Sequence, residues 1–476
     1  MRWALPHRWR WTTVAQIADV VGGGTPTASD TSNFDKQGIP WITPADLSGY
    51  SGTYIERGAR GLTKKGYASS GAKLMPANTV LFSSRAPIGY CVIATQPVTT
   101  NQGFKSLVLK VDVLPEYVRY YLLGSKRYVE ELASGTTFKE ISGRRMAEVE
   151  IPIAPLDEQH RIVTAIETHF SRLDAAVSML QRAKANVRRA RASVLTAAVE
   201  GRLVPTEAAL ARAEGRSFEP ASVLLARILR EREAAWRASG ARGKYKPPVR
   251  PDVAGLAEVP EGWCWASVDA LLREPLRNGK SAKPSETDKG IRTLTLTAVT
   301  TCKFTDQNTK LTVATADQVD GLWLEPGDLL MQRSNTPQLV GTTALYRGPR
   351  NWAVYPDLLI RVRTTPRVSV EFAALALISP LLRGYFRGSA KGIAGSMPKI
   401  GQDTIQMAPF PLPPLPEQHR IVAEVDRRLS TLAALDATLD TNLARCARLR
   451  QSILQRAFDG RLVPAADSTA TPTGAP

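Results

Sequence analysis

The chain of 476 residues is too long for a single hydrophobic core and is expected to form two to four domains. Hydrophobic residues make up 43% and charged residues 22%, a composition typical of globular proteins that argues against extensive disorder. The formal net charge of +18 and the pI near 9.9 indicate a polyanionic partner, either nucleic acid or a membrane surface.

The amino-terminal stretch "MRWALPHRWRW" lacks the apolar core of a signal peptide, and the longest apolar run, "FAALALISPLL" from Phe372, is too short to span a bilayer. The cysteines are scattered without a CxxC pair, so neither a zinc cluster nor a disulfide framework is indicated. They are Cys91, Cys264, Cys302 and Cys446. A soluble protein of the cytoplasm is expected.

Residues 1–150 are predicted to form one α+β domain. Short β-rich runs alternate with turn residues, as in "GGGTP" from Gly22 and "LMPANTVLFSSRAPIG" from Leu74, and one helix is expected over residues 115–133.

A long helix is predicted within residues 151–205. The phrase "PLDEQHRIV" from Pro155 is typical of a helix start, and Gly201 in "GRLVP" is typical of a helix end. A helix of about 44 residues would measure ~66 Å. Its apolar residues follow 3,4 spacing with two charged interruptions, which predicts a coiled-coil seam. The seam holds Phe170, Leu173, Val177, Leu180, Val187 and Val194, interrupted by Lys184 and Arg191.

The rest of the chain repeats this order. Residues 206–255 are predicted to hold a helix, "ASVLLARILREREAAWR", and a polar linker, and residues 256–409 a second α+β domain with one helix over residues 371–386. Residues 410–465 are predicted to form a second long helix, and residues 466–476 a disordered tail. The second seam holds Leu429, Leu432, Leu439, Leu443, Cys446 and Ile453, interrupted by Asp436 and Arg450.

An internal duplication explains the repeated order. Residues 158–205 and 417–464, offset by 259 positions, are identical at 21 of 48 positions without a gap, and "LPHRWRW" near the amino terminus matches "VPEGWCW" before the second domain. The predicted fold class is therefore α+β, with two mixed domains separated by two long helices. These helices are expected to form an antiparallel coiled coil about a pseudo-twofold axis.

These motifs resemble the specificity subunit of type I restriction–modification systems. The resemblance covers essentially the whole chain and depends on "GGGTP", the paired "EQHRIV" and "GRLVP" phrases and "ASVLLARILRERE…KYKPP". It implies two target-recognition domains that read an asymmetric, two-part sequence in double-stranded DNA, with the long helices as the spacer. It also implies two modification (methyltransferase) subunits as partners and, through them, restriction subunits. No cofactor is expected on this chain, whereas the partners would use S-adenosylmethionine, ATP and Mg. The second domain departs from the pattern where "GGGTP" becomes "RNGKSAKP".

Candidate DNA-binding residues lie in turn-rich polar runs, because Lys and Arg bind phosphates and Arg, Asn and Gln can read base edges. Arg85 and Arg333 are preferred, since each follows a corresponding predicted strand. The full set in the first domain is Lys64, Lys65, Ser84, Arg85, Asn101, Gln102, Thr136, Thr137 and Lys139. In the second domain it is Lys280, Lys283, Arg333, Ser334, Asn335, Lys391 and Lys399. The helix-start residues Glu158, Gln159, Glu417 and Gln418 are assigned to structure or to a subunit contact.

Two other functional classes are compatible with parts of this sequence. A DNA-modifying enzyme should carry an Asn/Asp-Pro-Pro-aromatic phrase or a nucleotide loop, but "VGGGTP" lacks GxGxxG spacing, and "GKS" at Gly279 lacks the leading glycine of a P-loop because Glu274 stands there. A coiled-coil scaffold that reads no DNA would share the predicted architecture. It would bind all duplexes weakly and equally.

Overall fold

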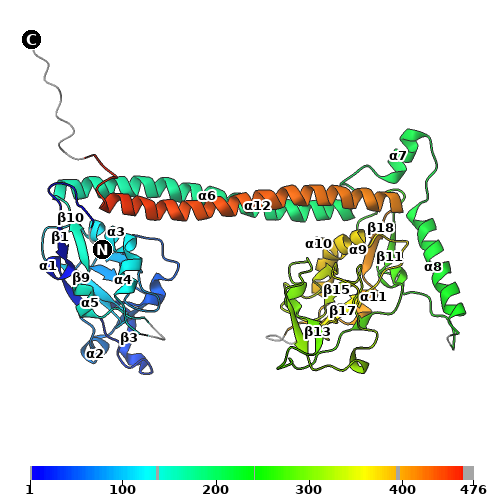
Figure 1. Ribbon diagram of the computed structural model, residues 1–476, viewed down its shortest axis with the longest axis horizontal. Helices are drawn as coiled ribbons and strands as arrows, with labels where there is room; N and C mark the ends of the chain where they lie inside the picture. Colours follow the sequence, from blue (N-terminus) through cyan, green and yellow to red (C-terminus); the bar gives the residue numbers. More distant parts are fainter. Residues whose placement is uncertain (1–2, 136–138, 241, 393–396, 465–476) are drawn as a thin grey trace, which may run out of the picture. The chain divides into compact units, whose positions relative to one another are not determined.

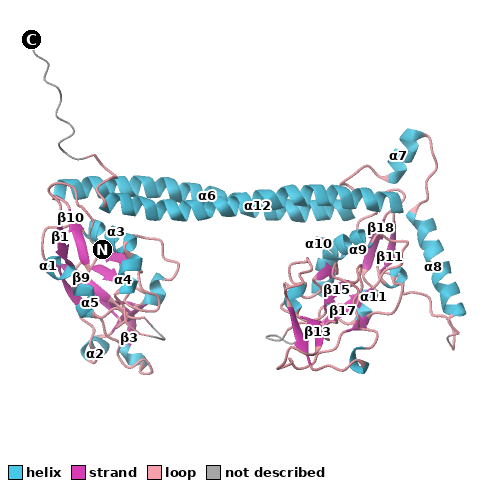
Figure 2. Ribbon diagram, in the orientation of Figure 1, coloured by secondary structure: helices cyan, strands magenta, loops and turns pink. Residues whose placement is uncertain are grey.

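The computed structural model describes residues 3–135, 139–240, 242–392 and 397–464. The chain divides into two compact units: unit 1, made of Met1–Arg182 with Leu439–Pro476, and unit 2, made of Ala183–Thr438. Each unit contains an α+β domain and a part of both long helices, as Figures 1 and 2 show. The predicted tail over residues 466–476 lies outside the described residues.

The domain of unit 1 is built on two small sheets. The larger has the order β2-β9-β6-β7-β4, and the smaller has the order β5-β3-β8. The strands are β2 (Ala18–Gly22), β3 (Phe34–Ile42), β4 (Tyr54–Ile55), β5 (Arg60–Leu62), β6 (Val80–Phe82), β7 (Cys91–Ala94), β8 (Thr99–Thr100) and β9 (Lys105–Leu109). The helices are α1 (Val14–Ile17), α2 (Lys64–Ala68), α3 (Pro115–Gly124), α4 (Lys126–Glu131) and α5 (Gly143–Ala147), and β1 (Arg10–Thr13) pairs with β10 (Glu150–Ile153).

Unit 2 repeats this plan with fewer strands in each sheet. Its larger sheet has the order β12-β17-β15-β16, and β13 pairs with β14. The strands are β12 (Arg277–Asn278), β13 (Ile291–Leu294), β14 (Thr309–Thr312), β15 (Leu329–Gln332), β16 (Thr343–Leu345) and β17 (Leu359–Val362). The helices are α9 (Val370–Ile378), α10 (Pro380–Ser389) and α11 (Gln402–Gln406), and β11 (Cys264–Ser267) pairs with β18 (Pro409–Leu412).

The single helix predicted in each domain is wrong, because the structure has two helices at each place. In unit 2 the apolar run of residues 371–386 is divided at Pro380, where proline begins α10 and the hydroxyl of Ser379 accepts a hydrogen bond from the backbone N–H of Leu382. Proline fits the first turn of a helix but not its interior, so the chain restarts there. In unit 1 the division falls at Ser125.

The two long helices have the predicted length of about 44 residues. Helices α6 (Leu156–Val199) and α12 (Leu415–Phe458) each contain 44 residues. Gly201 and Gly460 follow them with φ angles of +65° and +71°, the left-handed conformation that commonly ends a helix. An added Cβ on Gly201 would lie 2.5 Å from the ring of Pro260, and one on Gly460 would overlap the ring of Pro6. Each "GRLVP" turn thus packs on the Pro-x-x-Trp phrase that opens a domain.

Within each unit the segments of α6 and α12 lie side by side and run antiparallel (Figure 1). In unit 2 both Lys184 and Arg191 pair with Asp436, at 3.9 and 3.4 Å, and Val194 shares a buried cluster with Val425. In unit 1 the Arg450 guanidinium lies 4.2 Å from the centre of the Phe170 ring and pairs with Asp174. The charged interruptions of the predicted seam are therefore interhelical ion pairs.

Each helix pair is continuous with the core of its own domain. In unit 1 Phe170 and Phe458 pack edge-on against the tyrosines of α3, with ring centroids 5.0–5.7 Å apart. In unit 2 Ile421 and Val425 join the cluster around Phe372 of α9. Burying aromatic and branched side chains at these places fixes each domain to its helix ends.

Two further helices precede the second domain: α7 (Glu207–Glu214) and α8 (Ala221–Ala238). Leu224 and Ile228 of α8 are buried in the core of unit 2, and Arg232 bonds the carboxylate and backbone carbonyl of Asp269. Among the helices of the described ranges, none is long and apolar enough to cross a membrane.

Candidate nucleic-acid interface

The two glutamines of the "EQHRIV" phrases make side-chain hydrogen bonds within the protein. The side-chain oxygen of Gln159 accepts a hydrogen bond from the backbone N–H of Leu114 at 3.0 Å, and its amide donates to the carbonyl of Ala154 at 2.9 Å. Gln418 repeats both bonds in unit 2, with the N–H of Ser369 and the carbonyl of Pro413, each at 2.9 Å. Leu114 and Ser369 are the N-caps of α3 and α9, so each glutamine ties a long helix to the helix packed beside it.

The carboxylate of Glu417 is equally internal. It accepts hydrogen bonds from the backbone N–H of Glu207 at 2.8 Å and from Trp263 Nε1 at 2.9 Å. Burial raises the pKa of Glu417 above its ordinary value, although these bonds and nearby Arg420 oppose the shift. Its counterpart Glu158 is also buried. Gln159, Glu417 and Gln418 therefore make hydrogen bonds within the described part of the chain, and Glu158 is buried there.

Four loops meet at one end of the larger sheet in unit 1, and we call them loop cluster 1: residues 22–26, 84–88, 101–103 and 139–141. Backbone hydrogen bonds join them: Gly24 N–H to the carbonyl of Thr100, which directly precedes the third loop, Ser84 N–H to Gly103 O, and Ile141 N–H to Ser84 O, at 2.7–3.1 Å. The cluster brings together Ser84, Arg85, Asn101, Gln102 and Lys139 of the predicted set.

Unit 2 has the same framework, which we call loop cluster 2: residues 278–284, 333–340, 356–358 and 391–400 without the undescribed 393–396. The matching bonds are Lys280 N–H to Tyr355 O, Arg333 N–H to Leu358 O, and Ile400 N–H to Arg333 O, at 2.8–2.9 Å. All the predicted residues of the second domain lie in this cluster.

The departure of "RNGKSAKP" from "GGGTP" is a change of side chains on one backbone path. A Cβ on Gly23 would lie 2.1 Å from the carbonyl oxygen of Asn101, and a Cβ on Gly279 would lie 2.1 Å from that of Tyr355. Only glycine permits so close an approach, which shows why it is kept at this position in both units. Lysine then stands in unit 2 where Gly24 stands in unit 1, and "GKS" serves this turn instead of a phosphate loop.

The predicted equivalence of Arg85 and Arg333 is wrong by one residue. The hydrogen bonds of the two clusters align Ser84 with Arg333, and the isolated bridges Arg85–Glu140 and Ser334–Lys399 align Arg85 with Ser334. Residues next to each other on an extended chain point to opposite sides, so the two arginines leave their loops in different directions.

The two arginines also differ in their partners. Arg85 lies 3.5 Å from Glu140, which also binds Lys105 at 3.2 Å, and the Arg85 side chain is 39% exposed. The half-buried Arg333 makes no side-chain hydrogen bond or ion pair with any residue in the described ranges. A half-exposed ion pair contributes little stability, so Arg85 can exchange Glu140 for another anion at low cost.

The other predicted residues are distributed as follows. Ser84 and Ser334 are buried, and the amide of Asn335 bonds Gln332 at 2.7 Å. Lys64 and Lys65 lie outside loop cluster 1, on α2, where Lys65 pairs with Asp30 at 2.9 Å; hydrogen bonds from Ser32 and Lys65 lower the pKa of Asp30 to about 2. Lys139, Lys280, Lys283, Lys391 and Lys399 are exposed, and Thr136 and Thr137 lie outside the described residues.

The sequence did not identify three further polar residues of the clusters. Thr25 donates a hydrogen bond to Gln102 in unit 1, and Ser281 donates one to Asp357 in unit 2. All four side chains are exposed. Alignment of Gly23 with Gly279 is the signal that would have found them, because it places Thr25 opposite Ser281.

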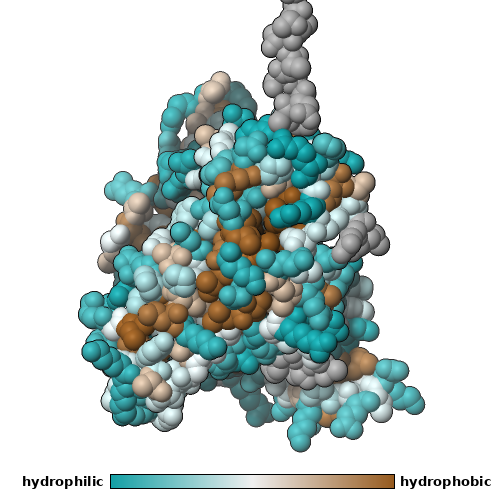
Figure 3. Space-filling view, turned by 90° about the vertical axis from the view of Figure 1, so that its left-hand side faces the viewer, coloured by the Kyte–Doolittle hydropathy of each residue, from teal (hydrophilic) through white to brown (hydrophobic). Residues whose placement is uncertain are grey.

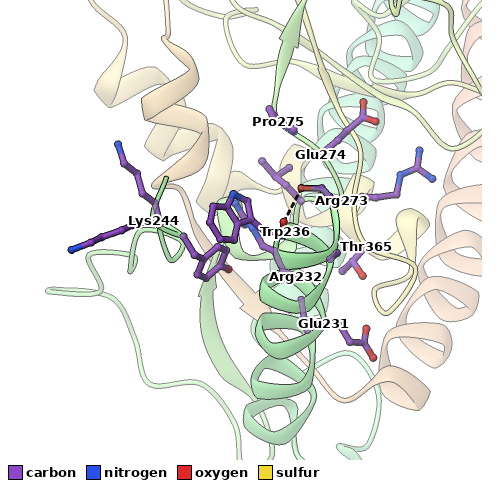
Figure 4. A pocket seen from close by; sticks show the side chains of 14 residues that line it. Glu231, Arg232, Trp236, Lys244, Arg273, Glu274, Pro275 and Thr365 are labelled. Carbon is purple, nitrogen blue, oxygen red and sulfur yellow. Dashed lines mark hydrogen bonds between the residues drawn. The ribbon is translucent and has the colours of Figure 1, made fainter. Parts of the chain in front are cut away.

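A cavity of about 660 Å³ opens beside α8 in unit 2 (Figure 4). Trp236 and Tyr245 line it, with ring centroids 5.7 Å apart and ring planes tilted by 53°, and Glu231, which also lines it, pairs with Arg367 at 2.9 Å. Within the described ranges no group of three or more His, Cys, Asp or Glu side chains could hold a metal ion. In unit 1, apolar side chains gather in the middle of one otherwise hydrophilic face (Figure 3).

Two copies of one α+β unit, with different side chains on the same loop framework, define a duplicated two-domain protein. The chain is similar to the specificity subunits of type I restriction–modification systems, which are the non-catalytic subunits of such systems. Residues 6–178 match the family model "Type I restriction modification DNA specificity domain".

Relatives and a solved structure agree with this assignment. The chain is 40% identical over 165 residues to the type I restriction enzyme MjaIX specificity subunit of Methanocaldococcus jannaschii, a match that covers 34% of this chain and 38% of that protein. It is 23% identical over 470 residues to the EcoKI specificity subunit of Escherichia coli K12, covering 96% and 90%. A chain from a structure on assembly and conformational transition of the type I R-M system has a TM-score of 0.67 and 18% identity, with 97% and 100% covered. That likeness establishes the fold.

Proposed function

We propose that this chain reads an asymmetric, two-part sequence in double-stranded DNA, with one part contacted by each loop cluster. The observation that carries the proposal is the shared framework with different side chains. A common backbone would meet DNA in the same way twice, and unlike side chains would then select unlike bases. The net charge of +18 supplies the general attraction to phosphates.

Within this proposal, the exposed lysines of the clusters bind phosphates, and Arg85 and Arg333 reach base edges or phosphates. The lysines are Lys139 in unit 1 and Lys280, Lys283, Lys391 and Lys399 in unit 2. The buried Ser84 and Ser334 would support the loops. Arg85 exchanges its exposed bond to Glu140 for DNA, whereas Arg333 has no side-chain partner to exchange among the described residues. Lys64 and Lys65, on α2 outside loop cluster 1, would at most contact flanking phosphates.

The partners proposed are two modification subunits and, through them, restriction subunits. The methyl donor, the nucleotide and the metal (S-adenosylmethionine, ATP and Mg) would all be held by those partners. We also propose a cytoplasmic location, where such partners and DNA would meet.

Binding of the chain, alone or with its modification subunits, to duplex libraries tests this function. One split sequence should be preferred, and a protein that makes six to ten phosphate contacts should lose about 10³- to 10⁵-fold in affinity between 50 and 200 mM salt. Arg85→Ala should weaken discrimination in one half only, whereas the equally charged, exposed Arg127→Ala should not. Equal, weak binding to every duplex would leave only a scaffold function.

A further inference from the structure

Two exposed polar pairs occupy the same place in the two loop clusters. In each, a hydroxyl donates a hydrogen bond to a longer polar side chain: Thr25 to Gln102 in unit 1, and Ser281 to Asp357 in unit 2. Gln102 precedes Gly103, whose carbonyl accepts from Ser84 N–H. Asp357 precedes Leu358, whose carbonyl accepts from Arg333 N–H. The two acceptors are therefore equivalent in backbone position and different in chemistry.

We propose that Gln102 and Asp357 are specificity-determining residues at corresponding positions of the two half-sites, and that Thr25 and Ser281 are the positioning residues that orient them. Gln102 selects adenine and Asp357 selects cytosine. This inference rests on the proposed function and assigns particular bases to particular side chains.

The donor and acceptor pattern decides the bases. A glutamine amide can accept from adenine N6 while it donates to N7; Thr25 donates to the oxygen of Gln102, which keeps a second lone pair for N6, and the amide nitrogen is the end that can donate to N7. The Asp357 carboxylate can only accept. With one oxygen held by Ser281, the other is free to accept from the N4 amino group of cytosine.

The charge of Asp357 favours a base over the backbone as its target. The chain has 62 Lys and Arg against 44 Asp and Glu, and Asp357 lies among the exposed lysines of loop cluster 2. These lysines attract phosphates, whereas the carboxylate of Asp357 has the same sign of charge as a phosphate and is repelled by it. A base amino group is the feature of a duplex that offers such a carboxylate a donor. Side chains held by a neighbouring bond on a rigid loop are also suited to discrimination, because little freedom is lost on binding.

Two isosteric changes test the assignment in the complex with its modification subunits. Asp357→Asn keeps an acceptor for Ser281 and adds donors, so one position of the second half-site should change from cytosine to adenine. Gln102→Glu removes the donors, so one position of the first half-site should change from adenine to cytosine. Each change should alter relative binding of the two bases by about fivefold or more. Methylation-aware sequencing and binding to duplexes with each of the four bases give the two readouts.

The controls separate base reading from charge and from loop support. Asp252→Asn makes the same charge change in the linker after α8 and should leave every preferred base unchanged. Ser281→Ala should reduce discrimination at the Asp357 position without changing the preferred base, and Ser281→Thr should restore it. If Asp357→Asn stops modification altogether, the duplex-binding readout decides. Unchanged base preference in both isosteric variants overturns the inference, whereas a parent protein without any sequence preference overturns the proposed function instead.

Discussion

Replacing Gln418 by methionine tests whether the repeated phrase stabilises the fold through its buried hydrogen bonds. Methionine has similar length but neither donates nor accepts the two bonds of the amide, so the N–H of Ser369 and the carbonyl of Pro413 would be left without partners in a buried place. Each unpaired buried group costs about 1–3 kcal/mol, so the variant should lose roughly 2–6 kcal/mol of unfolding free energy. That is a large fraction of the 5–15 kcal/mol typical of a domain.

Two measurements should agree. Urea unfolding followed by circular dichroism should show the loss, and hydrogen exchange should accelerate at the amide of Ser369, because Gln418 is its acceptor. Gln307→Met, at an exposed site in unit 2, is the matched control and should change stability by less than about 0.5 kcal/mol.

The duplication supplies a second copy of the experiment. Gln159→Met should show a similar loss, since its bonds to Leu114 and Ala154 have nearly the same lengths. The two effects should add, because the residues lie in different units and share no partner. If Gln418→Met matches its control in stability while binding of the modification subunits is lost, the phrase is a partner contact. The claim that its hydrogen bonds stabilise the fold is then refuted.

Three other changes have defined outcomes. Because the pKa of Glu417 is raised, its contribution to stability is full below the ordinary glutamate value of 4.5 and declines as pH rises toward the raised pKa. Glu417→Gln should remove this decline of the unfolding free energy with pH, measured by urea unfolding between pH 4 and 7. An unchanged decline would contradict the assignment. Inserting one heptad at the same level of α6 and α12 adds about 10.5 Å to the helices. The stretch of DNA between the two recognised parts should then lengthen by about three base pairs, or modification should cease. An unchanged stretch in the sequenced motif would show that the helices do not set its length. Exchanging residues 1–150 for those of a relative should alter only one half of the recognised sequence, and alteration of both halves would contradict modular reading.

The long helices could be predicted closely because their signals are local. Proline and glutamate at the start, glycine after the end and 3,4 spacing between them all lie within one segment, and each signal occurs twice. The division of the 371–386 helix was missed because the apolar run hid the meaning of Pro380, which begins a helix as readily as it interrupts one.

The loop clusters could not be predicted to the same degree. Their alignment depends on backbone bonds between segments far apart in the chain, such as Gly24 with Thr100 and Arg333 with Leu358. Matching the two domains by residue type pairs Arg85 with Arg333, whereas the backbone bonds pair Arg85 with Ser334. It also treats Gly279 as a departure, although this glycine stands in the same turn as Gly23.

The sharing of Asp436 by two cations limits how α6 and α12 can be aligned within unit 2. Lys184 and Arg191 are seven residues apart and both approach the same carboxylate, so the acid stands midway between them. A slide of either helix by one heptad would separate Asp436 from at least one of these two cations. Apolar contacts that repeat every heptad would tolerate such a shift, so the ion pairs to Asp436 favour one register of the two helices.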